Sequence, residues 1–163
     1  MKVTVISDTH MPRKAKALPK QVLDSILRTD AVIHAGDFTE IEVLEELEIL
    51  SKRVEAVTGN NDGFEILMRL GRQKVIEMAG YKIGIIHGDG ASYGSTPNRA
   101  KIAFKDEKVD IVIFGHSHQA FKEWDNGVLY LNPGSPTDKR RSPKFSFAEL
   151  NLKDKIEAKI YYF

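Results

Sequence analysis

Apolar and polar residues alternate through the first half of the chain in a pattern that predicts strands separated by helices. Short apolar runs typical of buried strands occur at Val3–Ser7, Ala31–His34 and Val54–Thr58. Apolar residues at helical spacing predict helices at Leu18–Arg28, Ile41–Leu50 and Phe64–Leu70. Strands that alternate with helices favour a parallel sheet in this half.

Hairpin patterns dominate the second half. Two turn sequences, Ala79-Gly80-Tyr81 and Asp125-Asn126-Gly127, separate the strand pairs Gln73–Met78 with Lys82–His87 and Phe121–Trp124 with Val128–Leu131. The remaining expected elements are a helix at Pro97–Lys105 near the capping residues Ser95 and Thr96, a buried strand at Asp110–Phe114, and closing strands at Phe145–Leu150 and Glu157–Tyr162. This succession of hairpins favours antiparallel pairing in the second half of the chain. We therefore predict an α/β protein in which residues 1–163 form a single domain, a four-layer sandwich of two face-to-face mixed β-sheets flanked by helices.

The composition describes a soluble globular protein and excludes sulfur chemistry. The 163 residues are 42% hydrophobic and 29% charged and include no cysteine, which rules out disulfides, a thiolate nucleophile, a zinc ribbon and an iron–sulfur cluster. Lys and Arg (24) nearly balance Asp and Glu (23), so the net charge does not imply nucleic acid as a partner. The N-terminal apolar run is too short for a signal peptide, and no stretch approaches the roughly 20 apolar residues of a membrane span. We expect a cytoplasmic protein without a membrane partner; the oligomeric state stays open.

Histidine, carboxylate and amide side chains collect where the predicted strands end. The five segments concerned are SDTH at 7–10, HAGD at 34–37, TGNND at 58–62, HGDG at 87–90 and GHSH at 115–118. The break from Gly88 to Asn98 reads as a functional loop. Because ligands of open α/β sheets bind at the carboxyl ends of strands, these segments predict one shared site.

The donor types and their spacing point to a metal centre. Asp8 and His10 are two residues apart, so an extended backbone places both on one side, and His116 and His118 repeat the arrangement. Nitrogen and oxygen donors without sulfur suit Mn²⁺, Fe²⁺, Ni²⁺ or Zn²⁺. The potential ligands are too many for one tetrahedral zinc and fit two metals that share a carboxylate.

Ordinary explanations exist for each motif taken alone. A D-x-H or H-x-H pattern occurs by chance, a lone buried histidine usually belongs to the core, and Gly-Asp or Gly-Asn pairs are common in turns. Their joint occurrence, with five segments each at a strand end, favours the metal site.

The order D-x-H, G-D, G-N, H and G-H-x-H, which runs from Asp8 to His118, resembles the motif set of the calcineurin-like metallophosphoesterase superfamily. The short chain and the segment Asn132-Pro133-Gly134-Ser135 are similar to its small prokaryotic phosphodiesterase branch. The resemblance implies a metallo-dependent phosphatase-like fold and a metal-dependent phosphoric ester hydrolase.

The resemblance also implies residue roles. The first metal would be held by Asp8, His10 and His118, the second by Asn60, His87 and His116, with Asp37 as the bridge. Asn60 and Asp37 are the expected catalytic residues. The implied cofactors are two divalent cations, foremost Mn²⁺ or Ni²⁺, with Fe²⁺, Zn²⁺ or Mg²⁺ also compatible. The implied reaction is in-line attack of a metal-bridging hydroxide on a small phosphodiester.

Two positions depart from the pattern of many relatives. Asn61 stands where a histidine can protonate the leaving group, and an amide cannot act as a general acid. Asp89 replaces a second histidine and is expected either to cap a turn or to contact substrate. Arg13, followed by Lys14, is a further candidate substrate contact, with a solvated loop as the equal alternative. His34 is expected to be structural.

Other interpretations remain at this stage. The basic run of Lys139, Arg140, Arg141 and Lys144 is interpreted as solvated surface, with nucleotide contact as the alternative. For the whole protein, the alternatives are a non-catalytic interaction scaffold of the same fold, for which the retromer subunit of the superfamily is a precedent, and a phosphomonoesterase. The filled ligand positions favour the enzyme over the scaffold.

Overall fold

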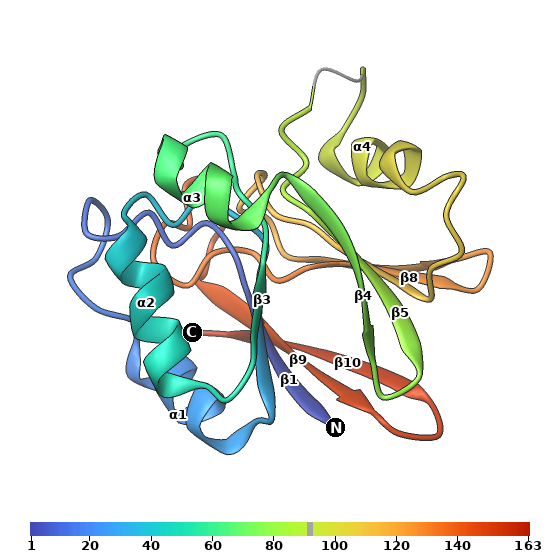
Figure 1. The fold of residues 1–163 in the computed structure, drawn as a ribbon, viewed down its shortest axis with the longest axis horizontal. Coiled ribbons are helices and arrows are strands. Elements are labelled where there is room, and N and C mark those ends of the chain that lie inside the picture. The colour runs from blue at the N-terminus through green and yellow to red at the C-terminus, as the bar shows by residue number, and fades with distance from the viewer. Residues whose placement is uncertain (91–92) are drawn as a thin grey trace.

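The computed structural model describes residues 1–90 and 93–163, and its strands form two five-stranded sheets (Figure 1). The first sheet has the order β10-β9-β1-β2-β3 and the second the order β4-β5-β6-β8-β7. The strands of the first sheet are β1 (Lys2–Ile6), β2 (Ala31–His34), β3 (Val54–Ala56), β9 (Ser146–Leu152) and β10 (Ile156–Tyr162). Those of the second are β4 (Gln73–Met78), β5 (Tyr81–Ile86), β6 (Ile111–Ile113), β7 (Phe121–Asp125) and β8 (Val128–Asn132).

Helices cover the outer faces of both sheets, which confirms the predicted sandwich. The helices are α1 (Lys20–Arg28), α2 (Ile41–Leu50), α3 (Phe64–Leu70) and α4 (Thr96–Ala103). Helices α1 and α2 lie over the first sheet and α4 over the second (Figure 1). Among the described residues, no helix is long and apolar enough to cross a membrane.

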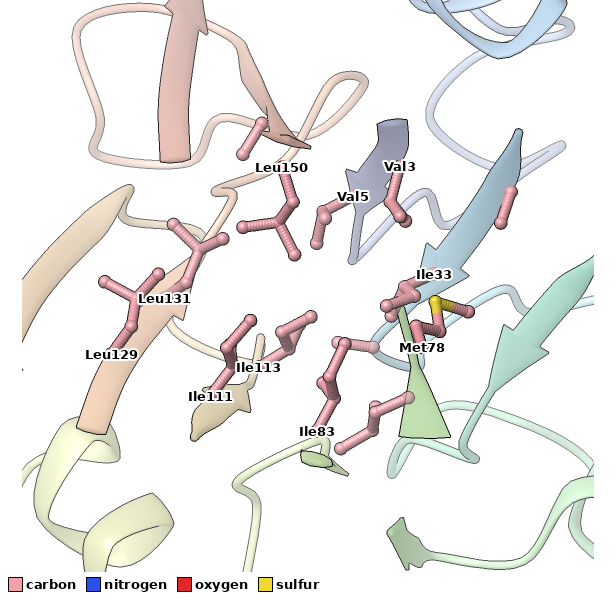
Figure 2. Close-up of a cluster of buried hydrophobic side chains, with 14 of the residues drawn as sticks. Val3, Val5, Ile33, Met78, Ile83, Ile111, Ile113, Leu129, Leu131 and Leu150 are labelled. Atoms are coloured by element: carbon pink, nitrogen blue, oxygen red, sulfur yellow. The ribbon is translucent and has the colours of Figure 1, made fainter. Parts of the chain in front are cut away.

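The core between the sheets follows from the period of two along each strand. Val3 and Val5 of β1 point into the inter-sheet cluster, whereas Ile6 packs with the helix layer on the other face. Ile111 and Ile113 of β6 likewise face inward. Figure 2 shows these side chains meeting aliphatic side chains of the opposite sheet.

The strands of the first half, β1, β2 and β3, pair in parallel as predicted, but the expectation of purely antiparallel pairing in the second half is wrong. β6 pairs parallel with both β5 and β8, and β9 joins the first sheet antiparallel to β1. β8 lies inside the second sheet because side chains on both of its faces pack against other elements. Leu129 and Leu131 of β8 face the inter-sheet core while Val128 and Tyr130 pack towards α4, so this strand fits inside a sheet. The more polar β7 lies at the edge.

Element boundaries differ from the expected ones by one or two residues in most cases. α1 begins at Lys20, after Pro19, and α4 begins at Thr96 and ends at Ala103. Each hairpin turn has two residues with positive φ, 50° and 83° at Ala79-Gly80 and 49° and 82° at Asn126-Gly127, as a two-residue hairpin loop of this hand requires. Tyr81 therefore belongs to β5. Residues 91 and 92 of the predicted functional loop lie outside the described residues.

Candidate metal centre

The loops that carry the candidate ligands continue from neighbouring strand ends. Beyond β1 and β2, the backbone N–H of Asp8 donates to the carbonyl of Gly36 at 2.9 Å, and that of His10 donates to Asp37 at 3.0 Å. The backbone then turns sharply: φ is positive at five candidate ligands, Asp8, His10, Asp37, His116 and His118. Non-glycine residues adopt this conformation at a cost, which is typical of functional sites.

One group of donors brings together residues of the first motif, D-x-H, and of the last motif, G-H-x-H. His118 Nε2 lies 3.3 Å from Asp8 Oδ1 and 3.3 Å from His10 Nε2. All three side chains are buried, and their donor atoms lie close enough together to hold one metal ion. The D-x-H and G-H-x-H motifs, more than 100 residues apart in the sequence, therefore meet at one point.

The second group consists of Asp37 and His87 together with Asp8 of the first group. His87 Nε2 lies 3.3 Å from Asp37 Oδ2 and 3.9 Å from Asp8 Oδ1, and all three residues are buried. Asp37 Oδ2 is also 3.4 Å from His10 Nε2, so this carboxylate lies between the two groups.

The donor atoms fit a metal because they lack other partners. Within residues 1–90 and 93–163, Asp8 Oδ1 and His87 Nε2 are buried and make no hydrogen bond, and a buried polar atom left so carries a substantial free-energy cost. The opposite ring nitrogen of His87 donates to the Ala35 carbonyl at 2.7 Å, and His118 Nδ1 donates to the Asp138 carbonyl. Since carbonyls only accept, both rings carry a proton on Nδ1, so in their neutral forms they present their Nε2 lone pairs to the centre, as metal-binding histidines do. His87, whose pKa the neighbouring carboxylates raise, would give up its Nε2 proton when a metal binds.

Asn60 and His116 form the exposed side of the centre. His116 Nδ1 lies 3.0 Å from Asn60 Oδ1, and the His116 ring contacts the His87 ring edge-on with centroids 5.3 Å apart. Asn60 is exposed and His116 half-buried. Two further donors thus converge beside His87 where the site opens to solvent.

Burial controls the protonation of the centre in the absence of metal. Burial raises the pKa of Asp8 to about 7 and lowers that of His118 to about 4. It also lowers the pKa values of His10 and His116, so these rings are neutral near pH 7. Burial opposes the charged forms of Asp37 and His87 too, but their mutual attraction outweighs it: the pKa of Asp37 falls below its ordinary value and that of His87 rises to about 9.

Glycines let the ligand carboxylates sit against neighbouring backbone. A Cβ on Gly59 would lie 2.1 Å from Asp37 Oδ1, and one on Gly115 would lie 1.9 Å from Ser7 Oγ, which itself donates to Asp8 Oδ2. A side chain at either position would displace a candidate ligand.

Asp62 supports the site through contacts that the sequence did not reveal. Its carboxylate accepts hydrogen bonds from three backbone N–H groups, those of Asp37 (3.0 Å), Thr39 (2.8 Å) and Gly59 (2.8 Å). It therefore fastens the Asp37 loop to the Asn60 loop. Its position two residues after Asn60 was the available signal.

The segment after β8 braces the Asp8–His10 loop from behind. Ser135 Oγ donates to the Asp8 carbonyl at 2.8 Å, and Thr137 Oγ1 donates to the Thr9 carbonyl at 2.6 Å. Asn132 Nδ2 donates to the Gly115 carbonyl at 2.7 Å. The Asn-Pro-Gly-Ser segment, known from the sequence only as a resemblance, thus has a physical role.

His34 is structural, as expected. The Gly36 N–H donates to His34 Nδ1 at 3.1 Å, so the proton of the neutral ring is on Nε2, which contacts Thr9 Oγ1 at 3.0 Å. Complete burial lowers its pKa well below the ordinary value. The ring stacks on Phe38 and ties the first two ligand loops together.

The candidate substrate contacts lie in three different settings. Asn61 Nδ2 donates to Asp37 Oδ2 at 2.7 Å, and its backbone N–H donates to Oδ1 at 2.8 Å. The Asp89 carboxylate forms an ion pair with the Arg72 guanidinium at 3.1 Å. Arg13 is exposed on the loop after His10, and Lys14 lies 3.8 Å from Asp138.

A two-sheet sandwich with buried His and Asp donors converging at its strand ends is the architecture of a metal-dependent phosphoesterase. The chain belongs to the calcineurin-like phosphoesterase superfamily, whose domain profile matches residues 1–155.

Known proteins agree with this membership. A relative named "Probable metallophosphoesterase" from Methanocaldococcus jannaschii is 41% identical over 98% of this chain and 80% of its own length. One named "Phosphodiesterase" from the same organism is 33% identical over 82% of this chain and 83% of its own. The crystal structure of Vps29 from Entamoeba histolytica complexed with Zn²⁺ is similar with a TM-score of 0.80 and 27% identity, covering 99% of both chains.

Proposed function

We propose that this protein is a dinuclear metal-dependent phosphodiesterase that hydrolyses a small phosphodiester. The observation that carries the proposal is a pair of adjoining buried donor groups that share Asp8, one with His10 and His118 and the other with Asp37 and His87. Within the described part of the chain, Asp8 Oδ1 and His87 Nε2 in these groups have no hydrogen-bond partner. The name of the phosphodiesterase relative supports the choice of a diester.

The geometry supports a division of the ligands between two ions. Asp8, His10 and His118, whose donor atoms form one group, would hold the first. His87 would hold the second together with Asn60 and His116, which lie beside its ring. Asp37 would bridge them, because its Oδ2 lies 3.4 Å from His10 Nε2 and 3.3 Å from His87 Nε2. The nitrogen and oxygen donors suit Mn²⁺ or Ni²⁺ and are compatible with Fe²⁺, Zn²⁺ or Mg²⁺.

Two bound divalent cations would neutralise the phosphate oxygens and lower the pKa of a water molecule enough for attack at neutral pH. In the overall reaction, the water oxygen bonds to phosphorus, the bond from phosphorus to the leaving oxygen breaks, and the water gives up a proton. Asn60 and His116, at the solvent-exposed side, face the arriving substrate. Asn61 carries no transferable proton, so the leaving oxygen departs as an anion or takes its proton from solvent.

Hydrolysis of bis(p-nitrophenyl) phosphate tests the proposal. We expect turnover with added Mn²⁺ or Ni²⁺, and a loss of at least about 100-fold in kcat for Asp37→Ala and His116→Ala because each removes a ligand. Lys52→Gln is a matched control, since Lys52 is exposed between α2 and β3, away from the ligand loops.

No turnover by folded protein with any of the five metals would overturn the proposal. A higher kcat/KM for p-nitrophenyl phosphate than for the diester would instead identify a phosphomonoesterase. Far-ultraviolet circular dichroism of each variant separates loss of a ligand from loss of the fold.

A further inference from the structure

An open hollow lies between the residues that follow the candidate ligand His118 and the end of β10. It measures about 440 Å³, and its lining includes Gln119, Ser142 and Tyr162. Ser142 Oγ donates to the His118 carbonyl at 3.0 Å, and Gln119 follows His118 directly. The hollow therefore begins one residue from a candidate ligand.

Two basic segments meet at this side of the centre. Lys14 and Arg140 both approach the Asp138 carboxylate, at 3.8 and 3.7 Å. Asp138 in turn accepts a hydrogen bond from His118 through its backbone carbonyl. A near-zero net charge thus conceals a local excess of positive charge, because the fold joins segments that are far apart in the sequence.

Two cationic side chains of the segment 139–144 line the hollow without an acidic partner. Arg141 and Lys144 are both exposed, and within residues 1–90 and 93–163 neither forms an ion pair. The neighbouring Lys139 is engaged, since its Nζ donates to the Pro143 carbonyl at 3.2 Å. Arginine and lysine placed together in a hollow match a phosphate group.

An aromatic side chain completes the lining. Tyr162 is 56% exposed and contributes to the same hollow as the two cations. An exposed aromatic face can stack on a nucleobase, a contact that tolerates any base. The volume is also that of a group the size of a nucleotide, at the small end of ligand pockets.

We propose that this hollow is a subsite for a second phosphate, so that the preferred substrates are phosphodiesters whose nucleoside-sized group carries a further phosphate. Arg141 and Lys144 bind that phosphate, and Tyr162 contacts the nucleoside. The inference rests on the proposed phosphodiesterase function and narrows its substrate class.

A matched pair of chromogenic esters tests the subsite. One is thymidine 5′-(p-nitrophenyl phosphate), and the other is the same ester with an added 3′-phosphate. Both release p-nitrophenolate, so they differ only in the second phosphate. We expect kcat/KM to be about tenfold or more higher for the 3′-phosphorylated ester, the size of one or two charge-assisted contacts.

Variants assign this preference to the hollow. In Arg141→Gln/Lys144→Gln, the ratio of the two kcat/KM values should fall to about one, whereas Lys52→Gln should keep the wild-type ratio. A wild-type ratio near one, or a double variant that keeps the preference, would overturn the inference.

Binding provides a readout that does not depend on turnover. Isothermal titration should show thymidine 3′,5′-bisphosphate binding more tightly than thymidine 5′-phosphate to the wild type but not to the double variant. Equal binding of the two nucleotides, or equally tight binding of inorganic pyrophosphate, would contradict a subsite for a phosphorylated nucleoside.

Hydrolysis of bis(p-nitrophenyl) phosphate by the same preparation separates the two failures. If the wild type hydrolyses this diester but shows no preference for the 3′-phosphate, only the subsite is wrong. If it hydrolyses none of the three diesters with any metal, the proposed function is wrong and the subsite loses its basis.

Discussion

At the residue scale, Asn61 is the position that most limits the chemistry. Its side chain and its backbone N–H each donate to one oxygen of Asp37, so both contacts serve the proposed bridging carboxylate. An amide in this place positions Asp37 but supplies no proton to a leaving group. We therefore expect the enzyme to favour substrates with good leaving groups.

Replacing Asn61 by His should change this preference. The backbone hydrogen bond to Asp37 remains, and the imidazole adds a proton donor at the solvent-exposed side. We expect the kcat/KM for a phenyl diester to rise about 10- to 100-fold relative to that for the corresponding p-nitrophenyl diester, because only the poorer leaving group needs protonation.

The measurement is that ratio of kcat/KM values in wild type, Asn61→His and Asn61→Ala. The alanine variant controls for the lost side-chain contact to Asp37. An equal change for both leaving groups in Asn61→His would contradict a role in proton transfer.

At the element scale, the ligand loops depend on segments that contribute no ligand. The stretch after β8 holds the carbonyls of Asp8 and Thr9, and Asp62 fastens the Asp37 loop. These contacts stabilise a backbone whose positive φ values are otherwise unfavourable.

Thr137→Val should loosen the metal centre while preserving side-chain shape. The variant removes the hydroxyl that donates to Thr9 and leaves a carbonyl unpaired in a buried place. We expect Mn²⁺ to bind about tenfold more weakly and the free energy of unfolding to fall by about 1–2 kcal/mol.

Metal titration and urea unfolding measure the two effects. Thr137→Ser keeps the hydroxyl and should retain most of the affinity. Wild-type metal affinity in Thr137→Val would show that this hydrogen bond does not position the ligands.

A second element-scale feature joins α1 to the β9–β10 pair. Glu149 accepts hydrogen bonds from Ser25 at 2.7 Å and Tyr161 at 3.0 Å, and it pairs with Arg28. Burial would raise the pKa of Glu149, but these donors outweigh it and hold the pKa below its ordinary value. The carboxylate is therefore more stable as an anion in the folded protein than in the unfolded chain.

Glu149→Gln should destabilise the protein in a pH-dependent manner. Because the folded-state pKa is lowered, the contribution of the carboxylate is present above its ordinary pKa of 4.5 and disappears as the pH falls through the folded-state value. We expect the free energy of unfolding to fall by about 1–2 kcal/mol at pH 7, with the deficit shrinking below pH 4.5.

Urea unfolding across this pH range gives the measurement. Glu157→Gln, at an exposed glutamate of β10, is the control and should show a smaller effect at pH 7. A deficit that does not change with pH would mean that charge is not responsible.

At the scale of the whole molecule, the metal centre joins the two sheets. Asp8, His10 and Asp37 come from loops of the first sheet, and His87 and His118 come from loops of the second. The inter-sheet core aligns these loops, and a bound cation would link both halves of the sandwich. Binding to this junction should therefore stabilise the entire fold.

Metal addition should raise the thermal midpoint Tm. At a concentration of about 100 times Kd, binding to the folded state contributes about 2.7 kcal/mol, which corresponds to a rise of about 5–10 °C for a chain of this size. Scanning calorimetry with Mn²⁺, before and after chelation, measures the shift. Asp37→Ala should show little of it, and an equal shift in that variant would place the stabilising ion elsewhere.

The sequence by itself determined most of the elements and the donor set. Periodicity predicted each helix and strand within one or two residues at most ends, because side-chain spacing is a local property. The sequence also placed the donor residues directly after predicted strands, and the carboxyl ends of parallel strands lie at the same edge of a sheet. Roles that depend on a donor's own chemistry, such as the inability of Asn61 to transfer a proton, were equally accessible.

Only the tertiary structure decided which distant segments meet. β9 joins β1 rather than the second sheet, Thr137 braces Thr9, and Lys14 meets the basic segment at Asp138. Each contact spans more than 100 residues of sequence, and no local pattern records it. Its physical cause is the packing of two sheets into one core, which fixes where polar side chains and charges come together.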